Sequence, residues 1–180
     1  LEKNYNDILK EAENLPKLLK KVLEDKEEFK SISKEIYQNK DVFYIGRGID
    51  YAMCLEGSLK LKEVSYTHSD AYQAGELKHG TISLIEEDVP VFAIITDDRI
   101  KDKTESNVIE VDSRKAKVFT ITNDDTIKNH HKKYVVPKTS YYLQAILTVP
   151  PLQLVGYYVG DLKKLDIDKP RNLAKSVTVE

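Results

Sequence analysis

Apolar residues follow two different patterns along the chain, and each pattern predicts a different kind of element. Over residues 2–37 they return every three or four positions, which is the spacing of one face of a helix. Pro16 interrupts this run and predicts the start of a new helix, because proline cannot donate to the preceding turn. Further helices are predicted over three later stretches, namely residues 50–66, 99–113 and 140–165.

Short, uninterrupted apolar runs separate these helices and predict buried strands. The runs cover residues 42–45, 89–95, 118–121 and 134–136. Strands that alternate with helices of this length need crossover connections, which produce a parallel sheet covered on both faces. The sequence therefore predicts an α/β fold with a doubly wound parallel sheet. In such sheets ligands bind beyond the carboxyl ends of the strands, so we expect the turn at residues 46–50 on the functional edge.

No internal repeat, low-complexity tract or linker divides the sequence, so we expect a single domain over residues 1–180. Its parts are a helical lead-in (1–40), an α/β core (41–165) and a C-terminal tail (166–180).

Composition narrows the class of partner and the compartment. The sequence is 41% hydrophobic and 32% charged with a formal net charge of -2, which is typical of a soluble globular domain. This balance argues against nucleic acid or an anionic membrane as partner, since both favour a concentrated basic surface. No apolar run reaches the roughly 20 residues that a bilayer needs, and residues 1–10 are too polar for a signal peptide. The single cysteine, Cys54, excludes an internal disulfide and fits a reducing, cytoplasmic setting, with Cys54 packed in the core.

The segment Gly46-Arg47-Gly48 follows the first predicted strand and raises the question of a dinucleotide cofactor. The dinucleotide fingerprint needs a third glycine at position 51, where this chain has Tyr51. We therefore expect a tight glycine turn and no cofactor.

Glu56, Lys60 and Glu63 are spaced so that they share one face of the second predicted helix. This spacing alone fits a surface Glu–Lys pair that stabilises the helix slightly. It also fits a carboxylate and an ammonium that converge on a ligand, where the carboxylate moves a proton between neighbouring carbons of a sugar.

Two groups of histidines have different surroundings in the sequence. His79 lies between Gly75 and Gly80, which predicts a short turn-bounded helix that presents an imidazole capable of acid and base chemistry. His130 and His131 lie among lysines in a polar stretch, and we expect both to be solvated. No cysteine or carboxylate stands at ligand spacing from them, so no metal site is predicted.

The C-terminal tail is unusually apolar for a chain end. Val177 and Val179 predict that it docks against the domain and holds Lys175 in place. An amine in a closed pocket can form an imine with a sugar carbonyl, but a packed tail with a bystander lysine fits the residues equally well.

Three segments, in this order, resemble one family. They are LEGSLKLKEVSY at 55–66, AYQAGELKHG at 71–80 and DKPRNLAKSVTVE at 168–180. The chain resembles the second, C-terminal sugar-isomerase (SIS) copy of the isomerising glucosamine–fructose-6-phosphate aminotransferases. The resemblance covers essentially the whole chain, and the small departures at Asp70 and Thr81 touch none of the candidate chemical groups.

The resemblance implies a five-stranded SIS sheet of flavodoxin-like topology and assigns roles to individual residues. Glu63 matches the general base that moves a proton between C1 and C2 of the sugar. Lys60 matches the lysine that stabilises charge on the enolamine. His79 matches the histidine that opens the sugar ring from across a dimer interface, and Lys175 matches the lysine that forms a Schiff base with fructose 6-phosphate.

Glu56 and Ala174 match positions near the substrate, with less specific roles. No segment here resembles the family's glutaminase or the Ser/Thr-rich phosphate loop of its first SIS copy. The resemblance therefore implies a part of a longer, homodimeric cytoplasmic enzyme that folds alone but does not turn over fructose 6-phosphate alone. Two alternatives stay open, an SIS deaminase or deglycase of amino-sugar phosphates and a non-catalytic sugar-phosphate sensor.

Overall fold

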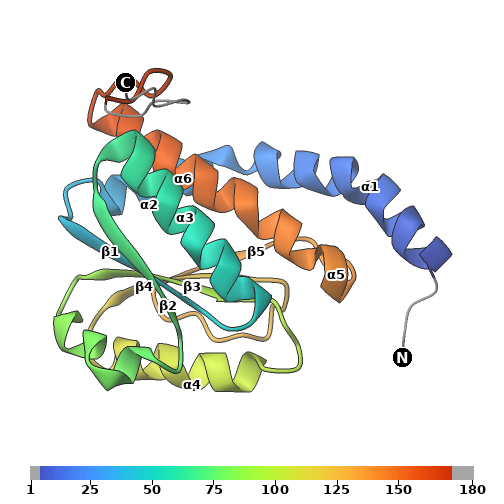
Figure 1. The fold of residues 1–180 in the computed structure, drawn as a ribbon, viewed down its shortest axis with the longest axis horizontal. Helices are drawn as coiled ribbons and strands as arrows, with labels where there is room; N and C mark the ends of the chain where they lie inside the picture. Colours follow the sequence, from blue (N-terminus) through green and yellow to red (C-terminus); the bar gives the residue numbers. More distant parts are fainter. Residues whose placement is uncertain (1–4, 172–180) are drawn as a thin grey trace, which may run out of the picture.

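The computed structural model describes residues 5–171 and contains a five-stranded, fully parallel sheet (Figure 1). The strand order is β2-β1-β3-β4-β5, the doubly wound order of flavodoxin-like proteins. The strands are β1 Asp41–Gly46, β2 His68–Gln73, β3 Pro90–Ile95, β4 Lys117–Thr122 and β5 Lys132–Val135. The α/β, doubly wound class predicted from the apolar pattern is confirmed.

Helices cover both faces of the sheet, as crossover connections require (Figure 1). One face carries α1 Tyr5–Glu24, α2 Lys26–Ile36, α3 Ile49–Ser65 and α6 Val149–Leu162. The other face carries α4 Lys101–Asp112 and the short turns η1 Leu77–His79 and η2 Thr81–Leu84. Between β5 and α6 the chain forms α5 Tyr141–Gln144 and η3 Ala145–Thr148. None of the helices within residues 5–171 is long and apolar enough to cross a membrane.

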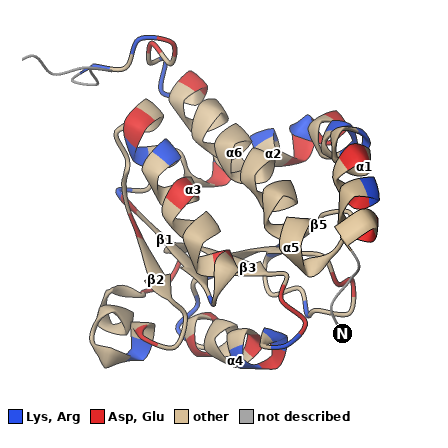
Figure 2. Ribbon diagram, turned by 45° about the vertical axis from the view of Figure 1, so that its right-hand side comes forward, with Lys and Arg blue, Asp and Glu red and all other residues tan. Residues whose placement is uncertain are grey.

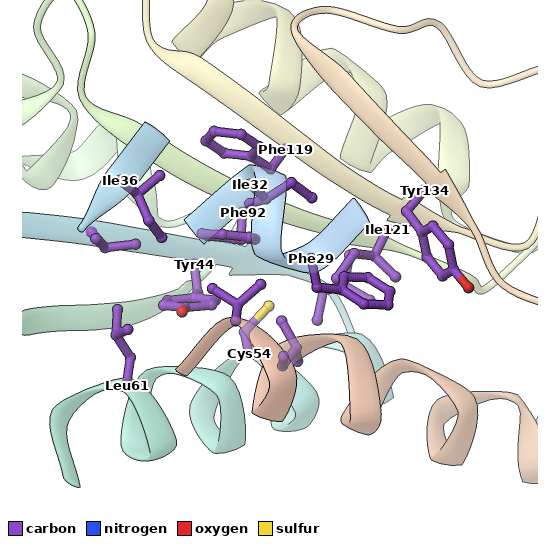
Figure 3. Packing of buried hydrophobic residues seen from close by; sticks show 14 of the residues in the cluster. Phe29, Ile32, Ile36, Tyr44, Cys54, Leu61, Phe92, Phe119, Ile121 and Tyr134 are labelled. Atoms are coloured by element: carbon purple, nitrogen blue, oxygen red, sulfur yellow. The ribbon is translucent and has the colours of Figure 1, made fainter. Parts of the chain in front are cut away.

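A row of stacked aromatic rings forms the centre of the core under the α3 and α6 layer (Figure 3). The Tyr44 and Phe92 rings stack at 5.0 Å between centroids, and the Phe92 and Phe119 rings at 5.1 Å. Cys54 points from α3 into this cluster and is fully buried, and burial raises the pKa of its thiol well above the ordinary value. The predicted core role of Cys54 is confirmed.

Two elements differ from the apolar-pattern prediction. β2 has no apolar run, because it is an edge strand whose residues are mostly half-exposed. α1 runs through Pro16 without a break, so the predicted new helix start there is wrong. Pro16 lies on the exposed side of α1, where water can satisfy the carbonyl group that loses its intrahelical partner. The break comes instead after Glu24.

Candidate functional site

The carboxyl edge of the sheet, the expected functional edge, is filled by its own side chains. Asp50 is 2% exposed and accepts hydrogen bonds from both the backbone N–H and the hydroxyl of Thr96. Burial raises the pKa of Asp50, and the bonds from Thr96 oppose that effect. Asp97 pairs with the Arg99 guanidinium at 2.7 Å, which holds the pKa of Asp97 below its ordinary value.

The remaining groups at this edge are also paired. Arg99 lies 3.9 Å over the Tyr141 ring, and Asn123 donates to the carbonyl of Thr96 at 3.1 Å. The hollow between these side chains has a volume of only about 90 Å³. No residue of the turn at 46–50 lines this hollow, and the expectation that this turn borders the site stays a prediction.

The helix α3 owes its orientation to small residues on its inner side. Gly57 lies so close to the core that an added Cβ would be 3.0 Å from Tyr44 and 3.1 Å from Leu152. Ser58 is buried and donates to the backbone carbonyl of Ser69 on β2 at 2.9 Å. This close packing, with Leu61 fully buried, turns the opposite side of α3 outward.

On that outer side the structure brings Glu56, Lys60 and Glu63 together. Lys60 Nζ lies 2.6 Å from Glu63 Oε2 and 4.0 Å from Glu56 Oε1. The side chains are 30%, 22% and 31% exposed for Lys60, Glu63 and Glu56, so a ligand can reach all three. The hydrogen bond with Glu63 is the main reason that the pKa of Lys60 is raised, and Lys60 is therefore cationic at neutral pH. The predicted shared face is confirmed.

This charged face lies toward the amino edge of the sheet, away from the hollow beside Asp97. Since α3 begins just after the carboxyl end of β1 and returns to the start of β2, its last turns lie beside the amino ends of the strands (Figure 1). Apart from the buried Asp50 in the first turn, the charged residues of α3 lie in its middle and last turns (Figure 2). The charged face of α3 and the carboxyl edge of the sheet are therefore separate regions.

The chain segment after α6 crosses the C-terminal end of α3. Lys163 Nζ donates to the carbonyl oxygen of Ser65 at 3.2 Å and to the Thr67 hydroxyl at 2.6 Å. Further along, the backbone N–H of Arg171 donates to the hydroxyl of Tyr66 at 2.6 Å. The segment that leads into the tail is therefore held beside the last turn of α3, which carries Glu63 and follows the turn of Lys60. Lys175 and Ala174, like the predicted docking of the tail, lie outside the described residues.

His79 lies in a different place from Lys60 and Glu63. It ends the short turn η1 and is exposed, as the flanking glycines predicted. Leu77, at the start of η1, is buried in the cluster beneath α4, whereas Leu61 of α3 is buried in the cluster on the opposite face of the sheet. Within one chain the structure does not bring His79 to the Lys60–Glu63 pair.

Arg47, for which the sequence predicted only a place in a turn, contacts the loop that leads to His79. Its guanidinium donates to the side-chain carbonyl of Asn107 on α4 at 2.8 Å. It also lies against Gly75, where an added Cβ would be 2.6 Å from Nη2. A side chain at position 75 would therefore push the Arg47 guanidinium aside.

Both histidines have acidic partners, but the prediction that they are solvated is wrong only for His130, because His131 is exposed as predicted. The His130 side chain is 2% exposed, and its Nδ1 lies 2.8 Å from Oδ2 of Asp112, although not aligned for a hydrogen bond. His131 Nε2 lies 2.6 Å from a carboxylate oxygen of Glu35 on α2. The polar sequence around them gave no sign that α2 and α4 would cover this stretch. Within residues 5–171 no three His, Cys, Asp or Glu side chains gather as metal ligands do.

Comparison with known proteins places these features in a family context. A family model described as "SIS domain" matches residues 35–159. The glutamine–fructose-6-phosphate aminotransferase (isomerizing) of Caldanaerobacter subterraneus is 48% identical over 177 residues, which is 97% of this chain and 29% of that protein. The enzyme of the same name from Thermotoga maritima is 44% identical over 99% of this chain and 30% of its own length.

Solved structures agree with the sequence relatives. The C-terminal domain of glucosamine-fructose-6-phosphate aminotransferase from Francisella tularensis matches with a TM-score of 0.85 and 31% identity, over 89% of this chain and 46% of that one. A phosphosugar isomerase structure from Silicibacter pomeroyi, at 21% identity and a TM-score of 0.77, shares the fold. The chain thus spans less than a third of the length of the curated relatives it matches.

Proposed function

Because this chain belongs to the SIS domain family, we propose that it is the C-terminal sugar-isomerising part of an enzyme that converts fructose 6-phosphate and glutamine into glucosamine 6-phosphate. The observation that carries this proposal is the Lys60–Glu63 pair, 2.6 Å apart on an open face of α3, with the lead-in to the tail held beside it. An ammonium and a carboxylate at this separation supply the charge and the base that a sugar isomerisation needs.

In the proposed reaction, the Lys175 amine attacks C2 of open-chain fructose 6-phosphate and loses water to form an imine. Ammonia then displaces Lys175 from that carbon. Glu63 takes a proton from C1 and returns it to C2, which turns the ketose imine into the aldose amine. Lys60, kept cationic by its hydrogen bond to the Glu63 carboxylate, stabilises the negative charge that develops on the enolamine. Glu56, 4.0 Å from Lys60, helps to fix that ammonium.

The proposal requires groups from outside the described chain. His79 opens the sugar ring, and since it lies on the face opposite α3, a second copy in a homodimer is the natural source of the imidazole. Ammonia comes from a glutaminase segment and the sugar phosphate is held by another SIS copy, both in the part of the relatives that this chain does not span. We therefore propose a cytoplasmic homodimer in which residues 1–180 fold alone but do not turn over fructose 6-phosphate alone.

The decisive experiment is a Glu63→Gln variant of the complete polypeptide that contains these residues. Loss of the base should lower glucosamine 6-phosphate formation by at least about 100-fold, because general-base catalysis contributes about that much or more. Exchange of the C1 hydrogen of fructose 6-phosphate with heavy water should fall in parallel. Glu13→Gln on the exposed side of α1 is the matched control. Normal product formation by Glu63→Gln would refute the role of Glu63.

The same polypeptide separates the proposal from the two alternatives. A deaminase or deglycase would release ammonia from glucosamine 6-phosphate without any use of glutamine. A sensor would bind sugar phosphate unchanged in a Lys175→Ala variant and form no product in either form. Glutamine-dependent product that disappears in Lys175→Ala supports the aminotransferase alone.

A further inference from the structure

The helix α6 packs closely against α3, and small residues make this close approach possible (Figure 1). An added Cβ at Gly156 would lie only 3.5 Å from backbone atoms of Lys60, and one at Gly57 would lie 3.1 Å from Leu152. The turn of α6 that contains Gln153 is therefore packed against the part of α3 that carries the charged face. A polar side chain on this turn can reach that face from a second helix.

Gln153 makes such a contact. The side chain is exposed, and its Nε2 donates to Oε1 of Glu56 at 3.3 Å. The same oxygen of Glu56 is the one that lies 4.0 Å from Lys60 Nζ. The Gln153 amide and the Lys60 ammonium therefore approach one carboxylate oxygen, and the amide is the nearer of the two.

This shared oxygen accounts for the partner that Lys60 takes. A glutamate four residues before a lysine is the favourable order for an ion pair on a helix, so spacing alone favours Glu56. The structure shows the opposite choice, because Lys60 Nζ lies 2.6 Å from Glu63 and 4.0 Å from Glu56. The bond from Gln153 engages the oxygen of Glu56 that Lys60 would otherwise bind.

We propose that Gln153 is a positioning residue of the candidate site, which keeps Glu56 away from Lys60 and so leaves the Lys60 ammonium to Glu63. The inference rests on the proposed function, in which Lys60 and Glu63 act together on the sugar. Without the Gln153 amide, Glu56 closes the remaining distance and Lys60 is shared between two carboxylates. The ammonium is then drawn away from the place where the developing charge needs it, and small displacements of this kind lower the rate.

The first test is a double-mutant cycle of Gln153→Met and Glu56→Met in the complete polypeptide. Gln153→Met keeps the length of the side chain and removes the amide. It should lower kcat for glucosamine 6-phosphate formation about two- to fivefold with little change in KM, as expected for one lost hydrogen bond. In the Glu56→Met background the same change should have no effect, because Gln153 acts only through Glu56. Gln38→Met is the control, since the exposed Gln38 amide donates to the Tyr37 hydroxyl just after α2.

A second measurement reports on Lys60 without the reaction. A limiting amount of acetic anhydride acylates lysine amines more slowly when the ammonium is held more tightly, and fragmentation mass spectrometry separates Lys60 from the exposed Lys62. Gln153→Met should slow the acylation of Lys60 relative to Lys62 about twofold, the size of one added ion pair on a helix. Unchanged acylation in Gln153→Met, or the same slowing in the Glu56→Met background, overturns the inference.

The two measurements separate failure of the inference from failure of the proposed function. If acylation of Lys60 changes as expected but the complete polypeptide forms no glucosamine 6-phosphate from fructose 6-phosphate and glutamine, the proposed function fails. Gln153 is then confirmed only as the residue that determines the partner of Lys60. If product is formed and Gln153→Met has the same kcat as Gln38→Met, the positioning role is refuted while the proposed function remains.

Discussion

The carboxyl edge of the sheet and the outer side of α3 contain the same kinds of charged groups, but those at the edge are mostly buried and those on α3 are partly exposed. At the edge, Asp50 and Asp97 are almost fully buried and have partners within the same network. On α3, Lys60 and Glu63 are paired but remain about a quarter exposed. The comparison shows that the polar side chains at the usual ligand edge of this α/β sheet are bonded to one another, while those on the face of α3 stay accessible to a ligand.

The largest expected difference between the two regions is in catalysis. In the complete polypeptide, Lys60→Met should lower product formation by about 100-fold or more, because the developing charge loses its counter-charge. Its thermal unfolding should hardly change, since partly exposed ion pairs contribute about 0–1 kcal/mol. Lys62→Met, on the exposed side of the same helix, is the control. Equal losses of activity in Lys60→Met and Lys62→Met would contradict a specific role of Lys60 in the reaction.

The second expected difference is in the stability of the folded chain and concerns the carboxyl edge of the sheet. Asp50→Ala leaves the buried backbone N–H of Thr96 without its acceptor, which should lower the free energy of unfolding by about 1–3 kcal/mol. Urea unfolding of the 180-residue chain measures this loss, with the exposed Asp102→Ala of α4 as control. A loss no larger than that of the control would mean that the edge is not a structural network.

A pair of glycine variants tests whether close packing turns the charged side of α3 outward. Gly57→Ala should destabilise the chain by about 1 kcal/mol, because Tyr44 and Leu152 must move to make room for the new Cβ. The cost of this movement should exceed the gain from the better helix propensity of alanine. Gly156→Ala on α6 has only ordinary contacts at 3.5 Å and should be neutral or stabilising. Urea midpoints decide between them, and a reversed order would contradict this account of α3.

The smallest expected effect is a pH dependence of the free energy of unfolding that comes from Asp50 at the carboxyl edge of the sheet. Because the pKa of Asp50 is raised in the folded chain, the native state keeps this proton to higher pH than the unfolded chain does. The resulting stability is fully present below the ordinary value of 3.8 and is lost as the pH rises through the folded pKa. The free energy of unfolding relative to Asp50→Asn should therefore fall from pH 4 toward neutrality in urea titrations. A difference that rises with pH would show that the Thr96 bonds outweigh burial.

The apolar pattern predicted those elements whose packing it directly reflects. The helix expected over 50–66 is α3, Ile49–Ser65, and the four apolar runs are four of the five strands. The apolar pattern did not predict β2, because an edge strand needs no continuous apolar run. Only the family resemblance implied a fifth strand. The helix break predicted at Pro16 was wrong, because whether a proline breaks a helix depends on whether it lies on the side that faces water.

The candidate site was predicted only where helical spacing determines it. Spacing placed Glu56, Lys60 and Glu63 on one side of α3, and the structure agrees. Spacing carries no information on contacts between distant segments, so the pairing of Arg47 with Asn107 and of Tyr66 with Arg171 had no sequence signal. The burial of His130 depends in the same way on elements far from it in the chain. The roles of Glu63, Lys60, His79 and Lys175 stay predictions.

The two-sided use of α3 has a consequence for how this protein tolerates mutation. Its inner side accepts only small residues at Gly57 and Ser58, and its outer side carries the proposed chemistry at Lys60 and Glu63. About half of the positions in α3 are thereby constrained, whereas exposed positions such as Leu55, Leu59 and Lys62 are not. In α1, by contrast, only Val22 is buried, so most substitutions there leave the packing intact. A saturation mutagenesis screen should find its densest band of loss-of-function variants in α3 and its sparsest in α1.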